Sequence, residues 1–392
     1  MLSAAFAAGY LLLVSLLWGA LIVQLRRPSS RNRLERLVLE GDQGAGPISL
    51  CVPVRNEVDL LEDFMTSVER LVVPGLEVVV VDDNSTDTTR EKLAEMASTR
   101  SWLRVVDAGL PPEGWSGKAW AMHRGAAEAQ EDLLLFLDVD VELSREGLST
   151  AVCEMKRLGL QLLSLRGETR VNNWRQGLLV PGAEWLARGA VDLNAVNASV
   201  SPEAHASETF VLVERVAFEA VGGFAAVRQQ LLPATGLTRV FNQRAKRFAL
   251  FDAPWVYSTG RDDGFRGRWA RYRRRLYQEL GRRPQVVLGL LLFTGITVLL
   301  PFGVLAGLIV GSMAGLLQLP PMWLSWSAGV CALVLGFRWI QERNSGRTGT
   351  YAWLHPIAMI LVAFNLLVSF LSVETTWKDR KFWDGRVRTE GT

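Results

Sequence analysis

Two strongly apolar segments, one near each end, constrain what this chain can fold into more than any other feature. Residues 2–25 form a run of 24 residues without a charged side chain, which is long enough for a helix to cross the hydrocarbon core of a bilayer. Residues 286–373 are also strongly apolar, whereas the residues between the two segments have the composition of a soluble domain. We therefore expect a membrane protein with a water-soluble domain between its membrane segments.

The residues around the first apolar segment predict its orientation. A cleaved signal peptide would have a basic start and a shorter apolar core; residues 1–26 have neither, so we expect them to form an N-terminal transmembrane anchor. Arginines follow closely: Arg26, Arg27, Arg31, Arg33 and Arg36. Because such residues favour the cytoplasmic side, we expect the N-terminus outside and the soluble domain in the cytoplasm, at the inner (cell) membrane. A buried helix of a globular protein is the alternative.

The second apolar region contains three or four candidate transmembrane helices. Its apolar stretches are residues 286–319, 322–340 and 354–373, and Pro301 interrupts the first. If Pro301 only kinks one helix, there are three spans and the tail, residues 374–392, lies outside; if it separates two short spans, there are four and the tail lies inside. The basic tail favours the inside, but Arg338, Arg343 and Arg347 favour the opposite arrangement, so the charge rule does not decide.

The remaining composition argues against several kinds of site. The chain has 392 residues, more than one domain usually needs, and a net charge of +3. Its cysteines, Cys51, Cys153 and Cys331, have no paired spacing, which argues against a disulfide framework or a zinc site and suits a reducing compartment. The three histidines are equally scattered, so a metal site built from histidines is not expected.

Strand and helix patterns alternate through the first half of the soluble region. Apolar strand patterns cover residues 48–54, 77–83, 103–106 and 133–141, and helix patterns lie between them. This alternation is typical of a doubly wound parallel sheet, in which ligands bind beyond the carboxyl ends of the strands. Acidic residues end the second and fourth strands, so we expect them to converge on one crevice.

The fourth strand pattern, Leu133–Val141, ends in two acids, Asp138 and Asp140. Both faces of this strand are apolar, as in a buried strand of a parallel sheet, and a strand's period of two points both acids the same way. Two carboxylates are costly to bury unpaired, and a divalent cation brought by a phosphate-containing substrate would offset that cost. An acid-rich turn without a ligand is the alternative interpretation.

In sequence order, the chain carries the motifs Val52-Pro-Val-Arg-Asn-Glu57, Val81-Asp-Asp-Asn-Ser-Thr-Asp87, Gly114-Trp-Ser-Gly-Lys-Ala-Trp120 and Phe136-Leu-Asp-Val-Asp140. Together they resemble the family 2 glycosyltransferases of GT-A fold, over residues 48–285. With Arg166-Gly-Glu, Trp174 and Pro181, the finer pattern is similar to the membrane-bound subgroup of hopanoid-associated and carotenoid glycosyltransferases. The resemblance implies an α/β fold: a GT-A (Rossmann-like, mostly parallel sheet) catalytic domain at residues 44–264 plus α-helical transmembrane segments.

The resemblance also implies donor-binding roles for individual residues. Pro53 and Glu57 would line the nucleotide pocket. Asp82 or Asp83 would accept hydrogen bonds from the base or the ribose. Lys118 would lie near the diphosphate, at a helix start whose backbone N–H groups also favour anions.

For the two acids after the fourth strand, the resemblance implies a metal site. Asp138 and Asp140 would be the metal-binding pair of the D-x-D motif, with Asp140 touching Mg²⁺ or Mn²⁺ and Asp138 also serving the donor. A metal held in this way stabilises the charge that develops on a nucleoside diphosphate leaving group.

The acceptor half departs from the family pattern. Residues 206–224 match the family segment that ends in Gly-Gly-Phe. A short distance later the family carries a pair of acids, the second of which is the general base. Here the pair is replaced by Pro233-Ala234, and neither side chain accepts a proton. Loss of a general base costs a factor of about 10² to 10⁴ in rate.

Three interpretations of this departure stay open. A displaced acid can serve as the base, with Glu208, Asp252, Asp262 and Asp263 as candidates. Glu208 is the most suggestive of these catalytic candidates, because it replaces a residue that is usually small in the family. Alternatively, the acceptor needs no base, as with a lipid phosphate that is already ionised, or the protein binds a nucleotide-sugar without turning it over.

Residues 265–285 predict a basic amphipathic helix. Eight arginines and one acid lie there, with aromatic and leucine side chains interleaved at helical spacing. Such a helix beside membrane segments is typical of one that lies on anionic lipid, and the neighbouring spans argue against nucleic-acid binding. Arg268 and Trp269 resemble a family element that sits by the diphosphate and the acceptor, which implies a role in donor binding.

Together these features predict a membrane-bound, family 2-like inverting glycosyltransferase. The inferred reaction moves a sugar from a nucleotide-sugar, with UDP as the expected nucleotide, to a lipid or isoprenoid hydroxyl. The expected partners are the donor, the hydrophobic acceptor and the membrane, without nucleic acid. A catalytically silent nucleotide-sugar-binding membrane protein is the competing hypothesis, because Pro233-Ala234 replaces the usual acidic pair.

Overall fold

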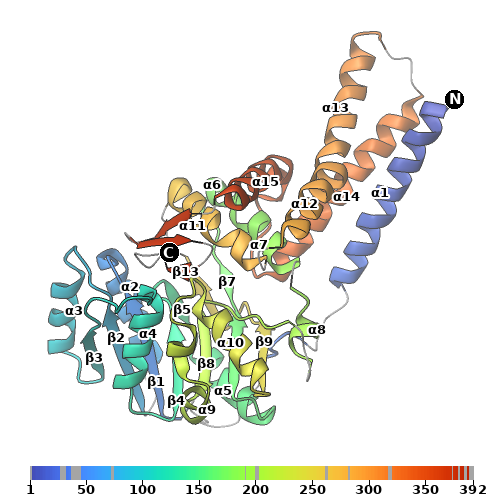
Figure 1. Ribbon diagram of the computed structural model, residues 1–392. Coiled ribbons are helices and arrows are strands. Elements are labelled where there is room, and N and C mark those ends of the chain that lie inside the picture. Colours follow the sequence, from blue (N-terminus) through green and yellow to red (C-terminus); the bar gives the residue numbers. More distant parts are fainter. Residues whose placement is uncertain are drawn as a thin grey trace. The chain divides into compact units, whose positions relative to one another are not determined.

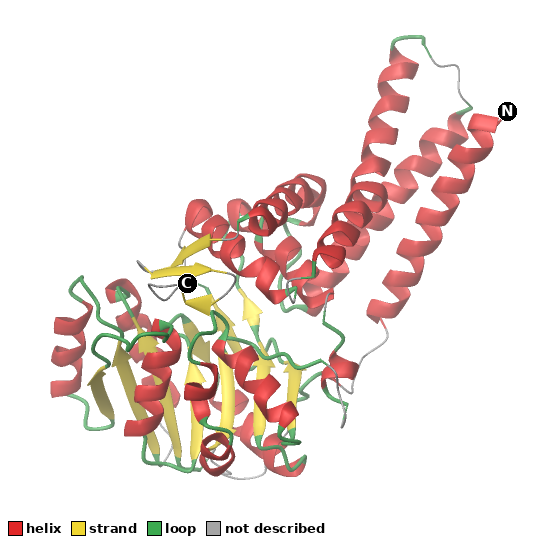
Figure 2. Ribbon diagram, in the orientation of Figure 1, coloured by secondary structure: helices red, strands yellow, loops and turns green. Residues whose placement is uncertain are grey.

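The computed structural model describes residues 2–26, 32–36, 46–71, 75–189, 191–198, 203–260, 264–280, 283–316, 320–372, 374–377, 380–383 and 386–387. The chain divides into two compact units. The sheet unit contains residues 30–169, 191–261 and 373–392, and the helical unit contains residues 1–29, 170–190 and 262–372. Figures 1 and 2 show the elements of each unit along the chain.

The sheet unit is built on a seven-stranded sheet. Its strands are β1 (Ile48–Val54), β2 (Leu76–Asp82), β3 (Leu103–Asp107), β4 (Leu133–Leu137), β6 (Leu162–Arg166), β8 (Phe210–Glu214) and β9 (Phe248–Asp252), in the spatial order β3-β2-β1-β4-β8-β6-β9. The neighbouring pairs β2–β3, β1–β2, β1–β4 and β6–β9 are parallel, whereas β8 runs antiparallel to both β4 and β6. The predicted α/β fold with a mostly parallel sheet is therefore confirmed.

Helices cover both faces of this sheet (Figure 2), because alternate residues of the central strands face opposite sides. Side chains of α2 (Val58–Leu71) and α5 (Arg145–Arg157) share one core with Leu50 and Val80. Side chains of α4 (Gly117–Glu128) and α10 (Pro233–Gln243) share a second core with Cys51 and Val79. Burial on both faces explains why the strands are continuous apolar runs in the sequence.

Shorter elements complete the sheet unit. Three helices and one 3₁₀ turn belong to it: α3 (Thr89–Ser98), α8 (Leu193–Val196), α9 (Arg215–Ala220) and Gly223–Val227. One three-stranded sheet consists of β5 (Val141–Leu143), β10 (Tyr257–Thr259) and β7 (Glu168–Thr169), and another, from the tail, consists of β11 (Glu374–Trp377), β12 (Arg380–Trp383) and β13 (Arg386–Val387).

The strand predicted for residues 133–141 is wrong at its end. β4 stops at Leu137, and the chain turns through Val139 and Asp140 into β5, with the Val141 N–H donating to the Asp138 carbonyl at 3.3 Å. The period-of-two argument therefore does not apply to the two acids. They nevertheless share one property, because both are partly exposed whereas Val139 between them is buried. Burying that valine explains why an apolar residue separates the acids.

The helical unit contains four helices that are long and apolar enough to cross a membrane, among the residues that the structure describes. Their apolar windows are Phe6–Val23, Pro284–Met313, Pro321–Asn344 and Ala352–Leu371. The elements are α1 (Leu2–Arg26), α6 (Trp174–Gly177), α7 (Val180–Gly189), α11 (Gly264–Glu279), α12 (Pro284–Phe293), a π-helical segment (Thr294–Leu299), α13 (Leu300–Met313), α14 (Pro321–Asn344), a 3₁₀ turn (Ala352–Leu354) and α15 (His355–Leu371). Residues 170–190, which we expected inside the GT-A domain, belong to this unit.

Pro301 does not divide the first C-terminal apolar stretch. Helical structure continues from Pro284 to Met313, and Pro301 lies in the first turn of α13, directly after the π-helical segment. That segment also binds α1, because the indole N–H of Trp18 donates to the Thr297 carbonyl at 2.9 Å and the Tyr10 hydroxyl donates to the Ile296 carbonyl at 2.8 Å. The widened turn of a π-helix thus supplies carbonyl acceptors inside an apolar bundle.

Candidate functional site

The carboxyl ends of three neighbouring strands bring several predicted site residues to one edge of the sheet. β1 lies between β2 and β4 and is parallel to both. Asn56 and Glu57 follow β1, Asp82 and Asp83 lie at the end of β2, and Asp138 follows β4. The acids at the ends of the second and fourth strands therefore lie at the same edge, as the alternating pattern predicts.

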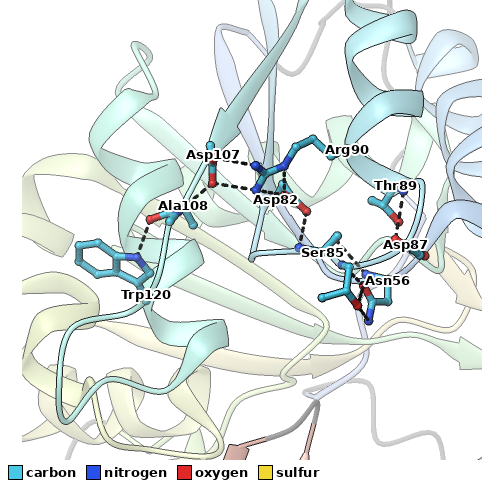
Figure 3. A network of polar contacts seen from close by, with 11 residues as sticks. Asn56, Asp82, Ser85, Asp87, Thr89, Arg90, Asp107, Ala108 and Trp120 are labelled. Carbon is cyan, nitrogen blue, oxygen red and sulfur yellow. Dashed lines mark hydrogen bonds and ion pairs between the residues drawn. The ribbon is translucent and has the colours of Figure 1, made fainter.

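Hydrogen bonds tie the loop after β1 to the loop after β2 (Figure 3). Asn56 has a φ of 53°, in the left-handed region that asparagine tolerates better than most residues. Its backbone N–H donates to Ser85 Oγ at 3.0 Å, and its side-chain oxygen accepts from the Thr86 N–H at 2.8 Å. The Glu57 N–H donates to Thr89 Oγ1 at 2.9 Å. Asn56 was not among the predicted site residues; an asparagine two residues after a strand is the signal for it.

Asp82 is held by the protein itself. Its carboxylate is almost completely buried, and Oδ2 accepts from Nε and Nη2 of Arg90 at 3.0 and 2.8 Å (Figure 3). Oδ1 accepts from the Ser85 N–H at 3.2 Å. Arg90 also forms an ion pair with Asp107 at 3.1 Å, so one guanidinium joins the ends of β2 and β3. Both oxygens of Asp82 therefore hold the loop, and Arg90 is a second site residue that was not predicted from the sequence.

The other predicted nucleotide-binding residues lie in or beside the same loops. Pro53 is half-buried in β1, and Glu57 and Asp83 are buried. The Asp83 N–H donates to the Val54 carbonyl at 2.8 Å, which fixes Asp83 beside the end of β1.

Asp87 acts at the start of α3. Its Oδ1 accepts from the Thr89 N–H at 3.0 Å. Burial by itself would raise the pKa of Asp87, but hydrogen bonds from the side chain and backbone of Thr89 and from the Val58 backbone lower this pKa below its ordinary value. Asp87 therefore stabilises the folded loop in its ionised form.

Lys118 connects Asp138 with the backbone at Glu208. It is the second residue of α4, which begins after Ser116, whose Oγ accepts from the Ala119 N–H at 3.2 Å. Lys118 Nζ donates to Asp138 Oδ1 at 2.7 Å and to the Glu208 carbonyl at 2.8 Å. Asp138 and Glu208 lie 20 and 90 positions after Lys118 in the sequence, so the structure brings together three predicted site residues that are distant along the chain.

Glu208 places a carboxylate beside Ala234 and Thr235, next to the residues at which the resemblance implies an acidic pair. It lies in the bend before β8 and is 8% exposed. Its Oε2 accepts from the Ala234 N–H at 3.1 Å and its Oε1 from the Thr235 N–H at 2.9 Å. These N–H groups belong to the first turn of α10, whose N-cap residue, Leu232, has no side-chain acceptor. Glu208 thus takes the usual role of an N-cap side chain from elsewhere in the chain.

The other candidates for a displaced base are placed differently or not described. Asp252 ends β9, the edge strand at the β6 side of the sheet, and its Oδ1 accepts from Nε of Arg166 at 2.9 Å. Asp262 and Asp263 lie outside the described residues. Of the two described candidates, Glu208 is the one whose carboxylate lies at the first turn of α10.

Arg268 and Trp269 lie in α11, in the helical unit. The Arg268 side chain is buried. The Trp269 ring packs against Phe265 and Phe364, with centroids 6.0 and 5.9 Å away, and its backbone carbonyl accepts from Asn365 Nδ2 at 3.0 Å. Both residues are part of the helical packing, and their role beside the diphosphate stays a prediction.

The two acids after β4 suit a metal ion whose remaining ligands come from a bound substrate. Among the described residues, no group of three or more His, Cys, Asp and Glu side chains is arranged to hold a metal ion. Mg²⁺, however, is usually bound by one or two carboxylates together with substrate phosphates and water. Asp138 and Asp140 supply two partly exposed carboxylates, which is the chemistry such an ion needs.

Comparison with known proteins shows what the region around the site is similar to. Residues 49–230 match the family model described as "Glycosyl transferase family 2". A 4,4'-diaponeurosporenoate glycosyltransferase of Staphylococcus haemolyticus is 33% identical over 109 residues, which cover 27% of this chain and 28% of that protein. A beta-monoglucosyldiacylglycerol synthase of Synechocystis sp. is 29% identical over 221 residues, which cover 54% of this chain and 45% of that protein. The match therefore spans less than half the length of either relative.

A solved structure shares the fold over most of the chain. The mannosyltransferase PcManGT of Pyrobaculum calidifontis, in complex with GDP-Man and Mn²⁺, superposes with a TM-score of 0.52 at 16% identity. The superposition covers 93% of this chain and 98% of that chain. At this identity the likeness shows the fold, which agrees with the mostly parallel sheet described above.

Proposed function

Because residues 49–230 match the model of the family 2 glycosyltransferases, we propose that this protein transfers a sugar from a nucleotide-sugar to a lipid or isoprenoid acceptor at a membrane. The observation that carries the proposal is the position of Glu208, whose carboxylate lies at the first turn of α10. The backbone carbonyl of the same residue accepts a hydrogen bond from Lys118 Nζ, which also donates to Asp138 Oδ1. One lysine therefore holds the backbone at Glu208 beside the proposed metal ligand Asp138.

In the proposed donor site, the nucleotide lies against the loops after β1 and β2. Pro53 and Glu57 line the pocket, and Asp83 accepts hydrogen bonds from the base or ribose, because Asp82 is 1% exposed and its carboxylate already accepts three hydrogen bonds within the protein. UDP is the proposed nucleotide.

The diphosphate lies beside Lys118, Asp138 and Asp140 in this proposal. Mg²⁺ or Mn²⁺, bound by the two aspartates and the diphosphate, would stabilise the charge that develops on the leaving group. Lys118 adds a second positive charge, at the start of α4, where backbone N–H groups also favour phosphate.

Glu208 is proposed as the general base that takes the proton from the acceptor hydroxyl. A carboxylate has about four lone-pair sites, and the two N–H groups of α10 use two of them. The remaining sites can accept the acceptor's proton as its oxygen attacks the sugar in line, with inversion. The alternative of a silent binding protein depended on Pro233-Ala234, and Glu208 compensates for that replacement.

The proposed acceptor is hydrophobic because four apolar helices accompany the sheet unit in the chain. The relatives named above are a 4,4'-diaponeurosporenoate glycosyltransferase and a beta-monoglucosyldiacylglycerol synthase, and both names specify hydrophobic products or acceptors. We assign the protein to the inner membrane, with the sheet unit in the cytoplasm, from the arginines that follow α1.

Turnover measured on purified full-length protein tests this proposal. The protein in detergent, with Mg²⁺ or Mn²⁺, is given a panel of UDP-sugars and native lipid extract. We expect Glu208→Gln to lower turnover by about 10² to 10⁴ while UDP binding is kept. Asp252→Asn is the matched control and should keep turnover, because Asp252 is paired with Arg166 at the far edge of the sheet.

Two results would overturn parts of the proposal. Undiminished turnover in Glu208→Gln, with an unchanged melting temperature, would exclude Glu208 as the base. Metal-dependent UDP binding without turnover of any donor by the parent protein would support the silent alternative.

A further inference from the structure

Helix α15 is apolar enough to cross a membrane, yet it packs against the arginine-rich helix α11. It lies along α11 within the helical unit (Figure 1). Near its middle, Asn365 Nδ2 donates to the Trp269 carbonyl at 3.0 Å, and near its end Ser369 Oγ accepts from the Tyr277 N–H at 3.2 Å. Later residues of α15 contact later residues of α11, so the two helices lie side by side and run in the same direction.

Ring contacts extend this pairing over most of both helices. Phe364 of α15 packs on Trp269 with centroids 5.9 Å apart, and Phe370 packs on Tyr277 at 5.3 Å. Towards the start of α15, Ala358 and Leu361 belong to the same apolar cluster as Phe265. Whatever depth α11 has in the membrane, α15 has nearly the same depth.

Helix α11 cannot lie inside the hydrocarbon. It has six arginines among its 16 residues, and they are spread over its length: Arg266, Arg268, Arg271, Arg273, Arg274 and Arg275. A charged side chain at the centre of a bilayer is strongly unfavourable, whereas a basic helix at the surface is attracted to anionic lipid. Arg266 and Arg273 are exposed, as contact with lipid head groups requires. Helix α11 therefore belongs at the membrane surface, and α15 is held there with it.

The free face of α15 suits the same position. Its exposed apolar residues recur every three or four positions and so form one stripe: Ile357, Ile360, Phe364, Leu367 and Leu371. Its other face is buried in the helical unit, through Met359, Val362 and Leu366. A helix with one apolar stripe left uncovered can lie in the membrane interface with that stripe directed into the acyl chains.

We propose that α15 lies in the plane of the membrane interface, where its stripe contacts the acyl chains of an anionic bilayer and α11 contacts the head groups. The membrane is then crossed by α1, by the continuous α12–α13 helix and by α14. This inference rests on the membrane location proposed above but not on the transfer reaction. It revises the expectation of three or four C-terminal spans, because two of the three apolar C-terminal helices cross.

This arrangement also settles the side of the tail, which the charge rule left open. With three crossings, the segment after α14 and the tail lie on the side of the sheet unit. Arg343, Arg347 and the basic tail are then all cytoplasmic, and residues 314–320, outside, contain no charged side chain. In agreement, residues 373–392 belong to the sheet unit.

Labelling of single cysteines in the full-length protein tests the side of the tail. In a background with the native cysteines replaced by alanine, Thr392→Cys should react with a membrane-impermeant maleimide only after cells are permeabilised. Ser98→Cys, exposed in α3, is the inside control, and Leu316→Cys, 80% exposed after α13, is the outside control. Labelling of Thr392→Cys in intact cells, as for Leu316→Cys, would overturn the proposal. If the cysteine-free background fails to fold, a fluorescent protein fused after Thr392 gives the same information, because it fluoresces when it folds in the cytoplasm.

A depth measurement tests the orientation of α15 independently. Environment-sensitive fluorophores are attached at Ile357→Cys, Phe364→Cys and Leu371→Cys, and the protein is placed in vesicles of phosphatidylcholine and phosphatidylglycerol. We expect a nitroxide near the lipid head group to quench all three sites more strongly than a nitroxide near the end of the acyl chain. If Phe364→Cys is deepest, with the other two sites shallow, α15 spans the membrane. Neither experiment requires the protein to be active, so failure of the transfer reaction leaves both interpretable.

Discussion

The ion pair between Lys118 and Asp138 predicts that one substitution will change metal binding and donor binding in opposite directions. Lys118 Nζ lies 2.7 Å from Asp138 Oδ1, and the two side chains are 11% and 28% exposed. If Asp138 is a metal ligand, the lysine competes with the metal for the same carboxylate. Lys118→Met removes the positive charge and keeps the length of the side chain and a good helix former in α4.

The structure sets the size of the expected effect. A hydrogen bond to a charged group contributes about 1.5 to 3 kcal/mol net, and the partial exposure of Asp138 screens the pair, so its net strength is about 1 to 2 kcal/mol. Since about 1.4 kcal/mol is a factor of ten, the affinity of the nucleotide-free protein for Mn²⁺ should rise by about 5- to 30-fold in Lys118→Met. With saturating metal, the affinity for UDP should fall by about tenfold or more, because the diphosphate loses a charged donor.

Electron paramagnetic resonance of free Mn²⁺ measures the first quantity, and calorimetric titration with UDP measures the second. Lys92→Met is the matched control, because Lys92 pairs with Glu62 and Glu95 on the surface of the sheet unit. Unchanged or weaker Mn²⁺ binding in Lys118→Met would refute the assignment of Asp138 to the metal. A UDP affinity that rises together with the Mn²⁺ affinity would refute the position of Lys118 beside the diphosphate.

Two further predictions concern stability. In the helical unit, Nε of Arg338 lies 2.6 Å from Glu342 Oε1, and both side chains are buried. Glu342→Gln should destabilise the protein by about 3 to 5 kcal/mol, because it leaves the buried charge of Arg338 without its partner. Adding Arg338→Met should restore most of the loss, and thermal unfolding in detergent measures both effects. Because the folded-state pKa of Asp87 is lowered, its stabilisation should be fully present above about pH 4 and disappear as the pH falls through the folded-state value. Asp87→Asn should flatten this pH dependence; a melting temperature with the parent's slope would contradict it.

Local sequence patterns were sufficient to predict most of the sheet. The strand predicted at residues 103–106 is β3, Leu103–Asp107, and the first strand was predicted at the same residues as β1. These predictions succeed because each central strand is buried on both faces, which requires an apolar run that nearby polar residues delimit. The antiparallel direction of β8 was not predicted, since strand direction depends on the path of the chain between strands.

The end of the fourth strand shows where pattern alone failed. Residues 133–141 have the apolar character of one strand, but the chain turns after Leu137. Val139 is apolar because it is buried in the core under the turn, not because it continues the strand. An apolar residue has the same appearance in the sequence in both cases, and the tertiary structure distinguishes them.

From the sequence by itself came the apolar helices, the mostly parallel sheet and the positions of the acids after its strands, because each depends on residues that are close together in the chain. The tertiary structure decided which of those acids are already engaged. It pairs Asp82 with Arg90, and it carries the carboxylate of Glu208 to Ala234, 26 positions away. It also lays α15 along α11, although the composition of α15 suits a spanning helix equally well. Side-chain partners and helix neighbours are long-range contacts, and periodicity along the chain contains no information about them.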